Sequence, residues 1–131
     1  MNRETEYRGK TIDGNRWVYG DIRHYKNGRV KIYDERIEFG TGAVNGFGFE
    51  VIPFTIGQYI GWKDRNNKKG YKDDLYTDRL GWMWRIGWND FYGQWMLFDT
   101  EDDSDWHEIN AEEFGYGEIT RSIHDTEEQA K

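Results

Sequence analysis

Apolar and polar residues alternate along this chain in short runs that are separated by glycines. Residues 17–22 read Trp-Val-Tyr-Gly-Asp-Ile and residues 30–33 read Val-Lys-Ile-Tyr, which is the period of strands with one buried face. Between these runs, Asn27 and Gly28 form a pair that suits the positive φ angles of a hairpin turn. We therefore predict a β-hairpin over residues 17–33.

The same pattern recurs along the rest of the chain. Residues 47–52 predict a strand that ends at Pro53, because proline lacks the N–H group that a sheet requires. Residues 82–88 and 94–98 predict a second hairpin around residues 89–93. Other predicted segments are strands at 56–62, 75–77 and 119–123, a polar loop at 63–72, about one helical turn at 109–114 and a frayed tail at 125–131.

Composition favours a mainly β fold. The chain of 131 residues contains 16 glycines, seven tryptophans, nine tyrosines and seven phenylalanines. Glycines this frequent leave little room for a helix of ordinary length. Each aromatic ring buries about 150–250 Å² and aromatic residues favour strands, so rings can supply the core. We therefore predict a folded, mainly β protein with little helix.

Composition also excludes several kinds of site. The chain has no cysteine, which excludes disulfides, a thiol nucleophile and thiolate metal ligands. Residues 1–6 lack the apolar stretch of a secretory signal, and no run of about eighteen residues is continuously apolar. We expect a soluble, cytoplasmic protein without a membrane partner.

Charge is distributed unevenly, although the net charge is only −7. Residues 1–72 have 14 basic and 9 acidic side chains, a net of +5, whereas residues 73–131 have 4 and 16, a net of −12. Such opposed charges suit either two subdomains that attract each other or a surface on which copies stack head to tail.

Two stretches of sequence point to a family. Arg8-Gly9-Lys10 and Trp17-Val18-Tyr19-Gly20-Asp21 resemble the opening of the YopX-like proteins of phages and prophages. Residues 51–68 resemble that family's V-I-P-x-T-V-G-Q-Y-T-G-L-K-D-K-N-G-K stretch almost position by position. The chain departs from the family at Asn67 and Asp73, which stand where the family has glycines. We expect Asn67 to adopt a positive φ there, since asparagine tolerates it better than most residues.

The resemblance implies a fold and an origin but no reaction. It implies an N-terminal β-rich subdomain over residues 1–58, packed with an SH3-like small barrel over residues 59–124 and followed by a flexible tail over 125–131. The two subdomains could also form one integrated domain. The barrel strands would be residues 74–77, 83–88, 94–98 and 118–123. The family is phage-associated and uncharacterised, so the resemblance implies a bacterial host cell and assigns no catalytic residue.

Two segments resemble ligand-binding motifs but lack the spacing that those motifs require. Residues 40–46 contain three glycines, but the third stands one position late for a dinucleotide fingerprint and no helix pattern follows. Glu101, Asp102, Asp103 and Asp105 cluster within five residues, yet their spacing does not fit a calcium loop. We predict that residues 40–46 form a loop that binds no cofactor, and that the four carboxylates lie in a solvated turn that binds no metal.

His107 is the most reactive-looking side chain, because imidazole titrates near neutrality. A general base needs a nucleophile or a substrate proton within reach, and the sequence nominates neither. His24 and His124 are distant in sequence, and three scattered histidines do not form a zinc set. We predict a surface or strand-face histidine and no catalytic residue, and we rank a hydrolase built on His107 lowest.

A basic segment with flanking rings is the candidate nucleic-acid site. Cations beside aromatic rings can hold single strands by phosphate attraction and base stacking. The same segment also matches the hairpin turn of the family, and the net charge of the chain repels nucleic acid. The candidate residues are Trp62, Lys63, Arg65, Lys68, Lys69 and Tyr71.

Binding to a protein is the function that the sequence favours most. Trp82, Trp84, Trp88 and Trp95 are expected mainly in the core, but a chain with so many rings should leave some exposed as a patch. We predict a non-catalytic phage or prophage accessory protein that binds a protein partner or assembles with itself. The alternatives are the nucleic-acid binder described above and an acidic nucleic-acid mimic that uses the carboxylates of residues 99–113.

Overall fold

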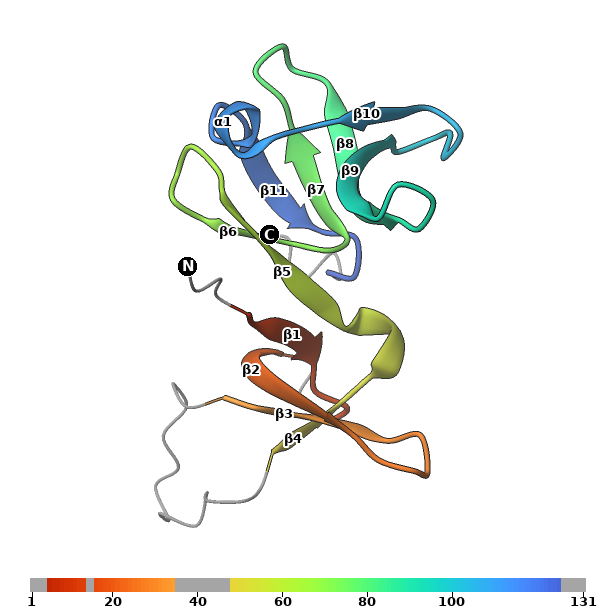
Figure 1. The fold of residues 1–131 in the computed structure, drawn as a ribbon. Helices are drawn as coiled ribbons and strands as arrows, with labels where there is room; N and C mark the ends of the chain where they lie inside the picture. Colours follow the sequence, from red (N-terminus) through yellow and green to blue (C-terminus); the bar gives the residue numbers. More distant parts are fainter. Residues whose placement is uncertain (1–4, 14–15, 35–47, 126–131) are drawn as a thin grey trace. The chain divides into compact units, whose positions relative to one another are not determined.

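The computed structural model describes residues 5–13, 16–34 and 48–125 (Figure 1), which form mainly β structure, as predicted. The helical segments in these ranges are the 3₁₀ turn η1 (Pro53–Thr55) and the single-turn helix α1 (Ala111–Phe114), and neither is long and apolar enough to cross a membrane. The strands are β1 (Tyr7–Lys10), β2 (Trp17–His24), β3 (Val30–Tyr33), β4 (Phe49–Val51), β5 (Gly57–Lys63), β6 (Lys69–Tyr71), β7 (Asp74–Thr77), β8 (Met83–Asn89), β9 (Gln94–Asp99), β10 (Trp106–Glu108) and β11 (Glu118–Ser122).

The strands form two antiparallel sheets. One sheet has the strand order β4-β3-β2-β1-β5-β6, and the other has the order β10-β9-β8-β7-β11. The chain divides into two compact units, residues 1–58 and 59–131, so that β5 begins in the first unit and continues in the second. Neither sheet of the described residues closes on itself, and the SH3-like barrel therefore stays a prediction.

The first unit contains the hairpin that the sequence predicts. Strands β2 and β3 pair with His24 opposite Val30, and Gly28 in the turn has φ +89°. The Asn27 side chain accepts a hydrogen bond from the Arg29 N–H at 3.0 Å, which closes the turn. Strand β4 ends at Val51, before Pro53, as expected. The buried core of this unit consists of Val18, Val30, Ile32 and Val51.

The core of the second unit lies on one face of the sheet that contains β7, β8 and β9. Alternate residues of a strand share a face, so Ile86 of β8 and Leu97 of β9, which pair directly, point to the same side. Tyr76 of β7 lies in the same core and has no exposed surface. The buried cluster consists of Ile60, Tyr76, Ile86, Leu97, Phe114 and Ile119, with Trp62, Trp84, Trp95 and Ile109 packed against it.

Helix α1 is attached to this core through Tyr76. The Tyr76 and Phe114 rings stack with centroids 4.5 Å apart, and the Tyr76 hydroxyl donates to the carbonyl oxygens of Glu113 and Phe114 at 3.1 and 3.0 Å. The Asn110 side chain accepts from the Glu113 N–H at 2.9 Å and caps the helix. Gly117 passes so close to Tyr76 that a Cβ there would overlap the Tyr76 hydroxyl. The predicted helical turn is therefore confirmed, and Tyr76, Gly117 and the Asn110 cap hold it in place.

Strands β5 and β6 form a hairpin, so the predicted polar loop is shorter than 63–72. The buried Asp64 carboxylate accepts from the N–H groups of Asn66 at 2.8 Å and Lys68 at 2.9 Å within the turn. Its other oxygen accepts from the Ile119 N–H at 2.8 Å, which ties the turn to β11. Asn67 has φ +64°, as predicted.

Asp73 is the second non-glycine residue with a positive φ, +72°, among the described residues. Its carboxylate is nearly buried, lies 2.9 Å from His124 Nε2 and accepts from an Arg85 NH group at 3.4 Å. A left-handed conformation costs an ordinary residue about 1–2 kcal/mol. The two side-chain contacts of the carboxylate offset that cost, which explains why an aspartate can stand at this position.

The two left-handed residues should respond oppositely to the same substitution. We expect Asn67→Gly to be neutral or to stabilise the protein by up to about 1 kcal/mol, because glycine adopts positive φ freely. Asp73→Gly should destabilise by about 1–3 kcal/mol, because it leaves Arg85 without its partly buried partner. Urea unfolding of both variants measures these effects, and Asp73→Asn, which keeps tolerance of positive φ, isolates the charge. An Asp73→Gly variant at least as stable as Asn67→Gly would contradict this account.

Candidate functional site

The aromatic residues of the predicted nucleic-acid site belong to the interior of the second unit. Tyr71 is 4% exposed, and its ring lies 5.7 Å from that of Tyr59. Trp62 is half-buried, with its ring centroid 6.0 Å from that of Phe114. An unstacked base therefore could not stack on Tyr71 in this conformation.

The cations of the same segment lie on the β5–β6 hairpin and differ in their surroundings. Arg65 pairs with Glu118 at 3.0 Å, and the Lys69 ammonium lies 5.1 Å from the centroid of the Tyr59 ring. Lys63 and Lys68 are exposed at the two ends of the turn. Contact with nucleic acid through this hairpin stays a prediction.

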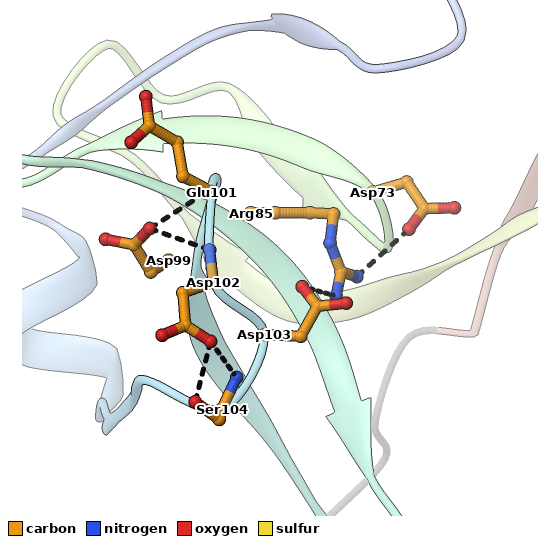
Figure 2. A network of polar contacts seen from close by, with 7 residues as sticks. All are labelled: Asp73, Arg85, Asp99, Glu101, Asp102, Asp103 and Ser104. Atoms are coloured by element: carbon orange, nitrogen blue, oxygen red, sulfur yellow. Dashed lines mark hydrogen bonds and ion pairs between the residues drawn. The ribbon is translucent and has the colours of Figure 1, made fainter.

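The acidic segment forms the turn between β9 and β10 (Figure 2). Two of its carboxylates accept hydrogen bonds from backbone N–H groups of the same turn. Asp99 accepts from the N–H groups of Glu101 and Asp102 at 2.8 and 3.1 Å. Asp102 accepts from the Ser104 hydroxyl and N–H at 2.6 and 3.0 Å, which holds the pKa of Asp102 below its usual value. Within the described ranges, no three His, Asp or Glu side chains are grouped so that they could hold a metal ion.

His107 lies on the exposed edge strand β10 beside a small pocket. Its ring stacks on Trp84 with centroids 5.8 Å apart. The pocket has a volume of about 220 Å³, which is enough for one large side chain. Its walls are formed by Tyr76, Asp78, Arg79, Leu80, Leu97, His107, Ile109 and Glu113.

The Asp78 carboxylate in this pocket is held by hydrogen bonds. Asp78 accepts from the N–H groups of Leu80 and Trp82 and from the Trp84 indole at 2.9–3.0 Å. Burial alone would raise the pKa of Asp78, but these hydrogen bonds, chiefly that of Trp84, lower it overall. Asp78 is therefore a firmly ionised structural carboxylate. The lining contains no serine, threonine or cysteine, and its one hydroxyl, that of Tyr76, donates to backbone carbonyls.

Tyr76 is a poor candidate for a catalytic acid or nucleophile. Burial raises the pKa of its hydroxyl to about 12, and the nearby Asp78 carboxylate contributes to the increase. At neutral pH the phenol is therefore fully protonated. His107 thus has a pocket beside it but no partner that could act as an activated nucleophile among the lining residues.

The sequence predicts that some rings are exposed, but it does not identify Phe91, Tyr92 and Trp106 as the ones that lie together. Phe91 and Tyr92, in the β8–β9 turn, are 87% and 51% exposed, and Trp106 of β10 is 39% exposed. The Tyr92 centroid lies 4.9 Å from that of Phe91 and 5.5 Å from that of Trp106. We call these three residues the ring cluster. The sequence placed Phe91 and Tyr92 in a turn, and two rings in a turn were the available signal that they lack a core to enter.

The tryptophans expected mainly in the core divide into two pairs. Trp84 and Trp95 pack against the core of the second unit. Trp82 is 66% exposed and Trp88 45% exposed, although the Trp88 ring still meets that of Trp95 edge to face at 5.1 Å. The expected exposed aromatic surface therefore exists.

The glycine-rich segment 40–46, the start of the predicted strand at Phe47 and residues 126–131 lie outside the described residues. A comparison of the chain with protein-family models and with curated proteins gave no match.

Loss of the Tyr76 hydroxyl should weaken the fold at neutral pH and matter less at alkaline pH. Tyr76→Phe removes the hydrogen bond to α1, so we expect a loss of about 1 kcal/mol near pH 7. The folded-state pKa of Tyr76 is raised above its unfolded value, so this contribution is fully present below about pH 10 and decreases as pH rises toward the folded pKa of about 12. Urea unfolding from neutral pH to about pH 11 should show the difference between wild type and variant shrinking. A difference that stays constant across this range would contradict the assignment.

Proposed function

We propose that this protein is a non-catalytic binding protein of phage or prophage origin that acts by contact with a protein partner. The observation that carries the proposal is the ring cluster, in which Tyr92 contacts both Phe91 and Trp106 while all three remain exposed. Isolated apolar residues are common on protein surfaces, but contiguous exposed rings are typical of interfaces. Tyrosine and tryptophan are also enriched among residues that dominate binding energy.

The proposed origin rests on the resemblance to the YopX-like proteins, and the backbone supports it at two positions. The family has glycines where this chain has Asn67 and Asp73, and these two residues have φ +64° and +72°. A glycine is the residue that such a conformation ordinarily selects. At both positions where this chain lacks the family's glycine, the backbone therefore keeps the positive φ that glycine favours.

Contact with a different protein is favoured over assembly of identical copies. Residues 1–58 contain nine basic and eight acidic side chains, whereas residues 59–131 contain nine and seventeen. The change of charge at residue 72 therefore does not separate the two units, and the first unit offers no strong positive charge to a neighbouring copy. With a net charge of −7, two copies also repel each other at long range.

Capture of a partner should depend on the ring cluster. We expect tagged wild-type protein to retain a specific protein from a bacterial host lysate, and a Phe91→Ser, Trp106→Ser double variant to lose it. Phe54→Ser is the matched control, because Phe54 is 72% exposed in η1 of the first unit. The proposal would be contradicted if wild type, the double variant and Phe54→Ser all retained the same partner, or if none of them retained one.

Light scattering after size-exclusion chromatography tests whether copies of this chain assemble with one another instead. We expect a monomer at low and at high salt. An oligomer that dissociates in the double variant would assign the ring cluster to self-assembly instead.

A further inference from the structure

Cations lie over aromatic rings at several places in this chain. Arg8 lies 4.5 Å from the Trp17 ring centroid and Arg16 lies 5.0 Å from that of Phe49. In the second unit, Arg85 lies 5.0 Å from the centroid of the Phe98 ring and also pairs with Asp73 and Asp103 (Figure 2). A cation over a ring is attracted by the negative face of the π system. Rings that carry a cation are thus a repeated feature of this fold.

The ring cluster has no such cation within the described part of the chain. The ring contacts of Phe91, Tyr92 and Trp106 there are with one another. Residues 86–120 contain no lysine and no arginine, so no cation is adjacent in sequence to these rings. The same stretch contains ten carboxylates, at Asp90, Asp99, Glu101, Asp102, Asp103, Asp105, Glu108, Glu112, Glu113 and Glu118.

Three of these carboxylates lie within two residues of a ring of the cluster in sequence. Asp90 precedes Phe91 in the turn, and Asp105 precedes Trp106. Glu108 follows Trp106 by two residues in β10, so the two side chains lie on the same face of the strand. All three are exposed and make no ion pair with the described residues. The described residues of the second unit therefore leave the carboxylates that flank the rings in sequence without an ion pair.

We propose that the ring cluster binds a cationic segment of the partner protein, with arginine or lysine side chains over the rings and the flanking carboxylates beside them. This inference rests on the proposed function and specifies the chemistry of the partner. Arginine suits the surface best, because a planar guanidinium stacks on a ring while it pairs with a carboxylate. A nucleic acid is disfavoured here because its phosphates would meet the carboxylates. A second copy is disfavoured because its net charge is also −7, and Arg65 and Lys69 of its most basic segment already have partners.

A hexa-arginine peptide is a suitable probe, with hexaglutamate as the negative control. We expect calorimetric titration to show binding to wild type that weakens about fivefold or more in Tyr92→Leu and in Trp106→Leu, within the range of partly desolvated cation–π contacts. Both variants keep the charge of the protein and an apolar side chain. Tyr116→Leu is the matched control, because Tyr116 is 50% exposed in the same acidic stretch but outside the ring cluster. It should change the affinity less than about twofold.

The outcomes separate this inference from the proposed function. No binding of hexa-arginine to wild type would overturn the inference. Equal affinities in wild type and the three leucine variants would also overturn it, because they would indicate only diffuse charge attraction. Ring-dependent capture of a partner without ring-dependent binding of hexa-arginine would leave the proposed function standing and remove the cationic segment. Tyr92 lies in an exposed turn, so Tyr92→Leu still provides the test if Trp106→Leu fails to fold.

Discussion

The second unit depends on a buried phenol. Tyr76 has no exposed surface, stacks on Phe114 and donates its hydroxyl to the last carbonyl groups of α1. A helix of four residues cannot persist by itself, because helix nucleation is unfavourable and one turn gains few hydrogen bonds. The position of α1, and with it the cover over Ile86 and Leu97, is therefore set by tertiary contact. Gly117 belongs to the same arrangement, since any larger residue would displace the Tyr76 ring.

This arrangement also explains why some rings are covered and others are not. Helix α1 supplies Phe114 to the core, and Trp62, Trp84, Trp95 and Ile109 pack around it. Phe91, Tyr92 and Trp106 lie in the β8–β9 turn and on the edge strand β10, and they are not part of that core cluster. Leaving three contacting rings exposed costs solubility unless they serve an interface. The same unit therefore combines a rigid core with a surface that suits a partner.

Local signals allowed the sequence to predict much of the fold, whereas contacts between distant residues remained hidden. Alternation and the Asn27–Gly28 pair predicted the β2–β3 hairpin, because the information lies within a few residues. The positive φ of Asp73 could not be predicted, because the contacts that stabilise it come from Arg85 and His124, which are distant in sequence. The His107 pocket could not be predicted, because it requires the register of β9 and β10 and the position of α1. For the ring cluster, the sequence indicated only that Phe91 and Tyr92 lie in a turn, and the contact with Trp106 required the register of β8, β9 and β10.

The distribution of charge has a local meaning once the units are known. The second unit is acidic as a whole, but its residues 63–72, at the β5–β6 hairpin, are locally basic, and there Arg65 and Lys69 already contact Glu118 and Tyr59. The acidic excess lies in residues 86–120, where the Asp99 and Asp102 carboxylates are used in the turn but Asp90, Asp105 and Glu108 are not. Several cations thus lie over rings within the chain, whereas the ring cluster stands in a stretch of sequence without cations. That imbalance, rather than the net charge, is what a partner would encounter at this surface.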